Sequence, residues 1–435
     1  MNNSASKSSL IFTSFLWKLY FFLLPFENLL EYSFGIKSQL KPYRVVSLII
    51  ILFYFSKFFL KGKGKINLHG HDFLILIIFL LGVIISVFNY ILAPQQFDWD
   101  LFFLNGNQIL IGILVYIFFR NYSAVLNSTK IESIISVYSV GICINNVFLI
   151  LQSIFSLELI NGLRPSGFIA NPNSAGLQNS IVILFFLYKF YNIKGNRKQA
   201  LYSLLIFFLI VGIFDTQSRV SLFIILIVLA SYFFQLSPIK KIIIGGVSLL
   251  FVLLFGSLLM QTEMISRIER KSKSNRPDER VEIWDKAMRL GVDTKFAGIG
   301  IGQFQRKSIV MEYFSITSFP SIRGELRKGT IGFGLHNTFL HVLIVYGFIP
   351  FLLFLTYIFI LNRNLFLKCK KDKFSKNSFN MFLWLSFLSV LFYSFTGEVF
   401  LSPLFWVFFA IFASNFNFNQ NVTQSLTGSD SNHEF

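Results

Sequence analysis

Long apolar runs joined by short polar connectors dominate this chain. Most of the runs approach the ~17–25 residues that a helix needs to cross the hydrocarbon core of a bilayer. Charged residues are only 14% of the 435 residues, too few to cover a surface that faces water on all sides. We therefore expect an all-α integral membrane protein of about twelve transmembrane helices. The runs cover roughly residues 10–30, 44–60, 73–93, 101–119, 133–155, 175–191, 200–214, 220–236, 242–260, 337–361, 379–396 and 399–414.

Lysine and arginine are distributed unevenly among the connectors. The net charge of +18 would favour a nucleic-acid partner in a soluble protein. If the N-terminus is cytoplasmic, however, twenty of these side chains fall in cytoplasmic connectors, and the short outer connectors hold only Lys37, Lys41, Arg44, Arg164 and Arg219. The positive-inside rule then places both termini in the cytoplasm. Since topology accounts for most of the charge, we expect a lipid bilayer as the partner and no nucleic acid.

The longest hydrophilic stretch is expected to lie outside the cytoplasm. It divides the chain into four predicted parts. These are spans one to nine (1–261), a large external loop with an amphipathic helix (262–336), spans ten to twelve (337–414) and a disordered cytoplasmic tail (415–435).

The external loop contains a predicted helix and a glycine-rich segment. The helix covers residues 275–291 and places Val281, Trp284 and Met288 on one face, so we expect it to lie along the membrane or to pack on the spans. The glycine-rich segment 298–302 resembles a dinucleotide-binding loop only weakly, because no βαβ unit surrounds it. A tight turn or a close backbone approach is the better interpretation of its glycines.

Three outer arginines are candidates for binding an anionic group. Arg164 is the only cation of the Pro- and Gly-rich stretch 163–176, Arg219 ends the short connector that begins at Asp215, and Arg280 lies in the loop helix. A charged residue at membrane depth is a functional hypothesis by default. The structural alternatives are that Arg164 extends to the lipid headgroups and that Arg219 simply pairs with Asp215.

His336 is the candidate acid–base residue. Of the five histidines, His69 and His71 lie in a cytoplasmic connector, His433 lies in the tail, and His341 lies one turn inside the tenth span. His336 alone stands at a glycine-flanked helix start on the outer face, and imidazole accepts and donates protons near neutral pH. The structural alternative is a helix-capping or interfacial imidazole. Since no metal-ligand pattern accompanies it, neither a metal nor a cofactor is expected.

Five motifs occur in a characteristic order. They are RPSGFIANPNSAG, DTQSR, RVEIWDKA, GIGIGQF and HNTFLHVLIVYG, and they run from Arg164 to Gly347. This ordered set resembles the bacterial O-antigen ligase and O-antigen polymerase superfamily, whose members are multi-span membrane glycosyltransferases of GT-C type with a large external loop late in the chain. In the ligases a His, an Asn and a later Gly are typical, and His336, Asn337 and Gly347 fit this pattern. The chain departs from the ligase pattern at Pro350.

The resemblance implies a metal-independent reaction with a polyprenyl-diphosphate donor. A glycan would move from undecaprenyl diphosphate to a sugar hydroxyl on the outer face of the cytoplasmic membrane. Arg164, Arg219 and Arg280 would bind the donor diphosphate, His336 would handle the acceptor proton, and Asn337 would orient the sugar or the imidazole. The implied partners are the lipid-linked donor, a saccharide acceptor and, for a polymerase, a chain-length regulator.

Three interpretations of function stay open at this point. Polymerisation of O-antigen, capsular or exopolysaccharide repeat units is favoured slightly by Pro350 over ligation to lipid A–core. A lipid-linked glycan transporter or flippase is the alternative of another class, but such folds usually show repeated halves, which this sequence lacks. A purely structural membrane subunit would leave the ordered arginines and His336 without an explanation.

Overall fold

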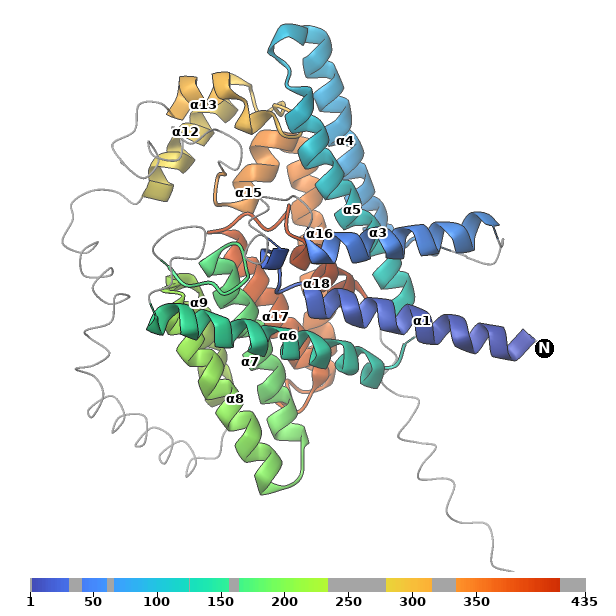
Figure 1. Ribbon diagram of the computed structural model, residues 1–435. Coiled ribbons are helices and arrows are strands. Elements are labelled where there is room, and N and C mark those ends of the chain that lie inside the picture. The colour runs from blue at the N-terminus through green and yellow to red at the C-terminus, as the bar shows by residue number, and fades with distance from the viewer. Residues whose placement is uncertain are drawn as a thin grey trace, which may run out of the picture.

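Helices make up all the regular structure that this chain shows. The computed structural model describes residues 2–30, 41–60, 66–124, 126–155, 164–233, 279–314 and 334–414, and within these ranges it contains no strand (Figure 1). The longer helices are α1 (Asn2–Leu23), α3 (Pro42–Phe55), α4 (Gly70–Leu92), α5 (Trp99–Ser123), α6 (Ser128–Ile154), α7 (Pro172–Asn192), α8 (Asn196–Asp215), α9 (Arg219–Phe233), α12 (Glu279–Asp293), α16 (Phe348–Lys371), α17 (Phe379–Ser394) and α18 (Pro403–Ala413). The shorter ones are η1 (Ser56–Leu60), η2 (Pro94–Gln96), η3 (Gln303–Gln305), α13 (Lys307–Phe314), α15 (Thr338–His341) and η4 (Val342–Tyr346).

Five of these helices are long and apolar enough to cross a membrane. They are α4, α5, α6, α8 and α16, and four shorter apolar helices accompany them. The structure therefore agrees with the expected all-α membrane protein. The count of twelve spans and the domain boundaries stay predictions, because the expected span 242–260, residues 262–278 and 315–333 of the external loop, and the tail 415–435 lie outside the described residues.

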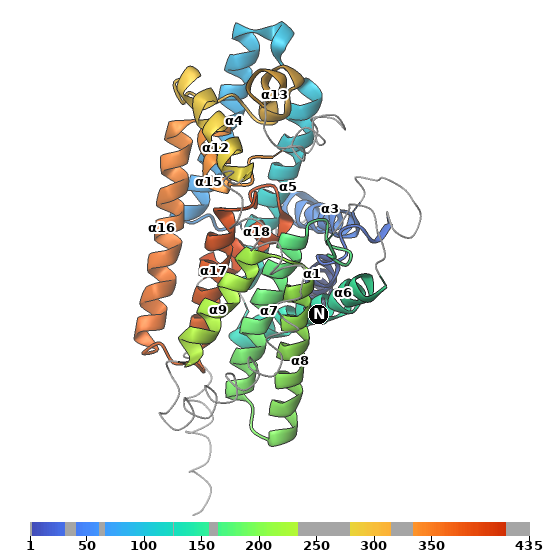
Figure 2. The same cartoon turned by 90° about the vertical axis from the view of Figure 1, so that its left-hand side faces the viewer.

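The most apolar helix occupies the centre of the bundle. Every residue from Leu404 to Ala413 in α18 is buried, and α18 packs against α5, α16 and α17. A helix that is apolar on all sides is expected in such an interior position. Helices α1, α3 and α6 pack together and run across the direction of α7 and α8 in Figure 1, whereas Figure 2 shows α16 running along one side of the molecule.

Connectors that the charge distribution assigns to the same side of the membrane contact one another. On the predicted cytoplasmic side, Asn192 Nδ2 donates to the Asn377 carbonyl at 3.0 Å. On the predicted outer side, the Asn28 N–H donates to the Phe168 carbonyl at 2.9 Å. Both contacts join connectors that the charge distribution assigns to the same side.

The predicted orientation can be tested with reporter fusions. Reporters placed after Lys63, Lys198 and Lys371 are expected to read as cytoplasmic, and one placed after Val310 as external, because of the lysine and arginine asymmetry. Alkaline phosphatase and green fluorescent protein fusions report the two sides with opposite signals. A cytoplasmic signal at Val310 would contradict an outer site.

The expected tenth span, 337–361, is wrong as a single helix. The chain forms α15 and the π-helix η4, stops at Gly347 with φ +89°, and starts again as α16. The cause is a backbone segment from the external loop: the Phe348 N–H donates to the Phe296 carbonyl at 2.9 Å, and the Ile299 N–H donates to the Ile344 carbonyl at 3.1 Å. These bonds satisfy backbone groups that the interrupted helix leaves open, as non-helical backbone at membrane depth requires.

The glycine-rich segment makes the close backbone approach that its sequence predicts. Gly300 and Gly302 have φ of +93° and +76°, which side chains other than glycine rarely adopt. A Cβ on Gly302 would clash with the Leu101 carbonyl, and one on Gly300 would lie 2.9 Å from Ser86 Oγ. The segment is therefore packed between α4, α5 and η4, and no phosphate-binding βαβ unit is present in the described residues.

The loop helix α12 forms where it is expected but buries a different face. It is described from Glu279 to Asp293, two residues beyond the predicted stop. Ile283, Ala287 and Leu290 face the protein, whereas Val281 and Met288 are 49% and 42% exposed. The exposed apolar side chains suit a helix that lies on a membrane surface.

Candidate functional site

His336 has an unusual backbone conformation. Its φ of +51° is a left-handed value that is uncommon outside glycine. The residues on either side hold it there: Trp284 Nε1 donates to the Leu335 carbonyl at 2.9 Å, and the Leu335 N–H donates to Glu398 Oε1. Asn337 then caps α15 by accepting the Leu340 N–H at 3.0 Å. Backbone strain that the surroundings enforce in this way is often found at functional sites.

His336 lines a polar cavity of about 340 Å³. We call this space the His336 cavity. Its walls come from the connector after α1, the starts of α3 and α7, the end of α17 and the connector between α17 and α18. Its polar and charged lining residues are Glu27, Lys41, Tyr43, Arg44, Gln108, Asn171, Asn173, Ser174, His336, Tyr393, Thr396, Glu398 and Ser402.

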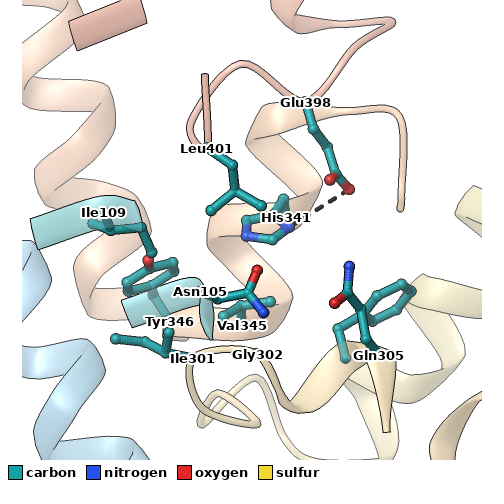
Figure 3. Close-up of a pocket in the computed structure, with 11 residues that line it drawn as sticks. Asn105, Ile109, Ile301, Gly302, Gln305, His341, Val345, Tyr346, Glu398 and Leu401 are labelled. Atoms are coloured by element: carbon teal, nitrogen blue, oxygen red, sulfur yellow. Dashed lines mark ion pairs between the residues drawn. The ribbon is translucent and has the colours of Figure 1, made fainter. Parts of the chain in front are cut away.

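A partly buried carboxylate, that of Glu398, lies beside two histidines at the edge of this cavity. His341 Nδ1 is 3.6 Å from Glu398 Oε1, as the dashed line in Figure 3 marks. Burial would raise the pKa of Glu398, but His341, His336 and the Leu335 N–H favour the charged form, and together they lower this pKa below its ordinary value. Glu398 is therefore an anion at neutral pH.

His341 itself borders a much smaller space. The pocket that it shares with Asn105 and Gln305 has a volume of only about 10 Å³ (Figure 3). Such a volume holds about one water molecule. Of the two spaces beside Glu398, only the His336 cavity has room for a group much larger than water.

Arg164 joins two of the outer motifs beside the cavity. Its Nε and Nη2 donate to the Thr216 carbonyl at 3.1 and 2.6 Å, and Nη2 also donates to Asn173 Oδ1 at 3.1 Å. Asn173 lines the His336 cavity. The structure thus brings the 163–176 stretch and the 215–219 connector together, as a shared site requires.

The other two predicted arginines lie at different distances from the cavity. Arg280 and Arg164 both act electrostatically on the hydroxyl of Tyr393, a cavity residue. Arg219 is exposed at the start of α9 and does not line the cavity. The carboxylate of Asp215, its suggested partner, accepts a hydrogen bond from Ser153 Oγ at 3.2 Å.

Asn337 was expected to orient the sugar or the His336 imidazole, but it does not line the His336 cavity. Besides capping α15, it lines an apolar groove of about 300 Å³ together with Trp284, Phe339 and Phe395. At the end of the 163–176 stretch, Asn171 caps α7, because its Oδ1 accepts the Asn173 N–H at 2.8 Å. Pro172 explains this register, because proline is favoured at the first helical position.

A second apolar space adjoins the cavity on its other side. It has a volume of about 450 Å³, lies between α3 and α5, and shares Tyr43, Arg44, Gln108, Leu401 and Pro403 with the His336 cavity. A molecule lying in this space would contact Arg44, which lines both spaces.

Lys41, Arg44 and Glu398 line the cavity, although the sequence patterns did not indicate them as site residues. Lys41 and Arg44 were only counted as connector charges, although both line the cavity and Lys41 pairs with Glu27 at 3.7 Å. Glu398 did carry a usable signal, because it is the only charged side chain between residues 377 and 414. A lone charge between two apolar runs marks a functional hypothesis.

No cluster of three or more potential metal ligands occurs among the residues that the structure describes. The carboxylates of the cavity, Glu27 and Glu398, are each engaged by a cationic or imidazole side chain. The cationic side chains that line the cavity are those of Lys41 and Arg44.

Together these features define a multi-pass, all-α membrane protein with a cationic, histidine-containing cavity among its connectors. A family model described as O-antigen ligase matches residues 204–355, a range that includes Arg219, Arg280, His336 and Asn337. This match supports the O-antigen ligase-like superfamily that the sequence motifs resemble, and with it a glycosyltransferase-like membrane enzyme that acts in O-antigen or polysaccharide biosynthesis. Arg164 lies outside the matched range. No curated protein matches the chain.

Proposed function

We propose that this protein polymerises lipid-linked repeat units of an O-antigen, capsule or exopolysaccharide. It moves a glycan from undecaprenyl diphosphate to a sugar hydroxyl at the outer face of the cytoplasmic membrane, with both termini in the cytoplasm. The observation that carries this proposal is the position of His336, which is held at φ +51° in a cavity lined by cations. The family match supports the same type of reaction.

The leaving group explains why the site needs cations. Negative charge grows on the diphosphate as the glycosidic bond breaks, and without a metal only side chains can stabilise it. Arginine suits this role because it stays charged and binds two phosphate oxygens at once. Arg44 at the cavity wall, with Arg164 and Arg280 around it, meets this need; Arg219 would act from the rim.

His336 would act on the acceptor. The acceptor O–H bond breaks as the new bond from its oxygen to the anomeric carbon forms, and the proton passes to the imidazole. The bond from the anomeric carbon to the phosphate oxygen breaks, and its electron pair leaves with the diphosphate. Asn337 supports this arrangement indirectly, because it caps the helix that follows His336.

Two apolar spaces favour a lipid on each substrate. One lies between α3 and α5 and ends at Arg44; the other is lined by Trp284 and Met288 of α12, on the helix that carries Arg280. A polymerase joins two polyprenyl-linked substrates, and each polyprenyl chain needs an apolar path. Pro350 does not distinguish polymerase from ligase, since it lies in the first turn of α16, where proline is tolerated.

Transfer by the purified protein tests this proposal. We expect vesicles that contain the protein and its native undecaprenyl-diphosphate-linked repeat unit to yield longer lipid-linked glycans, and we expect EDTA to leave the rate unchanged. Gel electrophoresis of the labelled glycan measures both. Transfer to added lipid A–core instead of to a second repeat unit would identify a ligase. Activity that EDTA abolishes and Mn²⁺ restores would contradict the metal-independent mechanism.

A further inference from the structure

Glu398 is a partly buried anion with no role in the mechanism described so far. It lies in the connector between α17 and α18, opposite the segment that carries His336. We propose that Glu398 is a positioning residue that orients the His336 imidazole and stabilises its positive charge during transfer. This inference rests on the proposed function and names the group that assists its acid–base residue.

The two segments are fastened to each other by hydrogen bonds. Thr338 Oγ1 donates to the Gly397 carbonyl at 2.8 Å and accepts the Val399 N–H at 3.0 Å. These bonds are made by the residues immediately before and after Glu398. They fix the backbone of Glu398 relative to the start of α15, and therefore relative to His336.

The two oxygens of the Glu398 carboxylate differ in their hydrogen bonds. The Leu335 N–H donates to Oε1, and His341 Nδ1 lies 3.6 Å from the same oxygen. Within the described ranges no side chain or backbone group donates a hydrogen bond to Oε2. A Cβ built on Gly334 would lie only 2.8 Å from Oε2 and 3.0 Å from Oε1, so glycine lets the backbone two residues before His336 approach this carboxylate closely.

The charge of this carboxylate matches the needs of the proton transfer. Glu398 and His336 line the same cavity, and His336 favours the charged form of Glu398 although burial disfavours it. When the acceptor O–H breaks and its proton reaches His336, the imidazole becomes a cation. The ionised Glu398 offsets that charge without taking the proton itself, as the carboxylate of a hydrolase triad does. The His341 imidazole stays beside Oε1 of Glu398 during this step.

The alternative is that Glu398 only fastens the α17–α18 connector to α15. A structural role of that kind changes folded yield and thermal stability. It does not change the pH at which transfer loses half its rate. The pH dependence of turnover therefore separates the two roles.

Glu398→Gln is the informative variant because it keeps the shape and removes the charge. We expect turnover to fall by about 10- to 100-fold, the factor that one interaction with a charged group supplies. We also expect the acid limb of the pH–rate profile to move to lower pH, since loss of the anion disfavours a protonated imidazole. The other charged or titratable groups that line the two spaces beside Glu398 stay unchanged in the comparison; they are Glu27, Lys41, Tyr43, Arg44, His341, Tyr346 and Tyr393.

Glu132→Gln is a matched control. Glu132 is also a partly buried carboxylate that pairs with a cation, Lys189, and accepts a hydrogen bond from Tyr188 at 2.7 Å, but it lies away from the cavity. We expect its pH–rate profile to match that of the parent protein.

The outcomes distinguish this inference from the proposed function. If the parent protein does not transfer glycan at all, the proposed function fails. If the parent transfers and a folded Glu398→Gln protein keeps both its rate and its acid limb, only the role of Glu398 is overturned. A Glu398→Gln protein that does not fold is replaced by Glu398→Asp, which keeps the charge on a shorter side chain. Glu398→Asp should retain the parent acid limb with lower turnover, and an acid limb shifted to lower pH would overturn the role.

Discussion

Replacing His336 by alanine is expected to stop glycan transfer while donor binding stays close to normal. The reason is that His336 would handle only the acceptor proton, and loss of one positioned acid–base group lowers a rate by about 10²–10⁴. The measurement is paired: binding of the undecaprenyl-diphosphate-linked glycan and its transfer are followed in the same preparation. If His336 were only a helix-start residue, its replacement would cost about 1 kcal/mol of stability and little activity.

The left-handed backbone at His336 provides a control for this experiment. Alanine at φ +51° adds backbone strain, whereas asparagine and glycine tolerate such values. His336→Asn and His336→Gly should therefore fold at least as well as His336→Ala while lacking the imidazole in the same way. All three variants should be inactive. A folded His336→Asn protein that transfers glycan at close to the parent rate would remove His336 from the mechanism.

Arg280 is expected to show the second large effect, and on the donor. Arg280→Lys keeps the charge but loses the planar group that binds two phosphate oxygens, so donor affinity and turnover should both fall. Arg280→Ala should nearly abolish transfer, because removing a charge-assisted contact to the leaving group costs about 10²–10³ in rate. Titration of the lipid-linked donor, followed by single-turnover transfer, measures the two steps separately.

The same helix offers a control residue. Arg289 is also an arginine of α12, but it is largely exposed and pairs with Asp285 at 2.9 Å. Exposed ion pairs of this kind contribute little. Arg289→Ala should therefore leave donor affinity near the parent value. Equal losses at Arg280 and Arg289 would show that α12 needs positive charge in general and not one arginine at the diphosphate.

Local patterns were sufficient to predict much of this fold. The apolar runs located the helices, since a span needs little more than length and apolar character. The lysine and arginine count grouped the connectors into two sets, and contacts such as Asn28 with Phe168 agree with that grouping. Glycine spacing predicted the close backbone approach at Gly300 and Gly302.

Such local patterns could not predict the contacts between segments that lie far apart in the sequence. The run 337–361 is apolar throughout, and only the hydrogen bonds from residues 296–300 explain its interruption at Gly347. Glu398 similarly follows His336 by about sixty residues in the sequence and meets it only through the packing of α17 and α18. Arg44 was treated as a topological charge because nothing near it in the sequence indicates the cavity that it lines.

The central position of α18 affects how the protein is made. Among the described helices, α18 is the last to be synthesised. It nevertheless packs against α5, which is synthesised some three hundred residues earlier. The helices inserted first therefore lack this packing partner until α18 has been synthesised. Glu398 lies in the connector that leads into α18, so a chain truncated before this connector lacks both the central helix and the carboxylate proposed to assist His336. Under the proposed function, glycan transfer therefore requires the chain through α18.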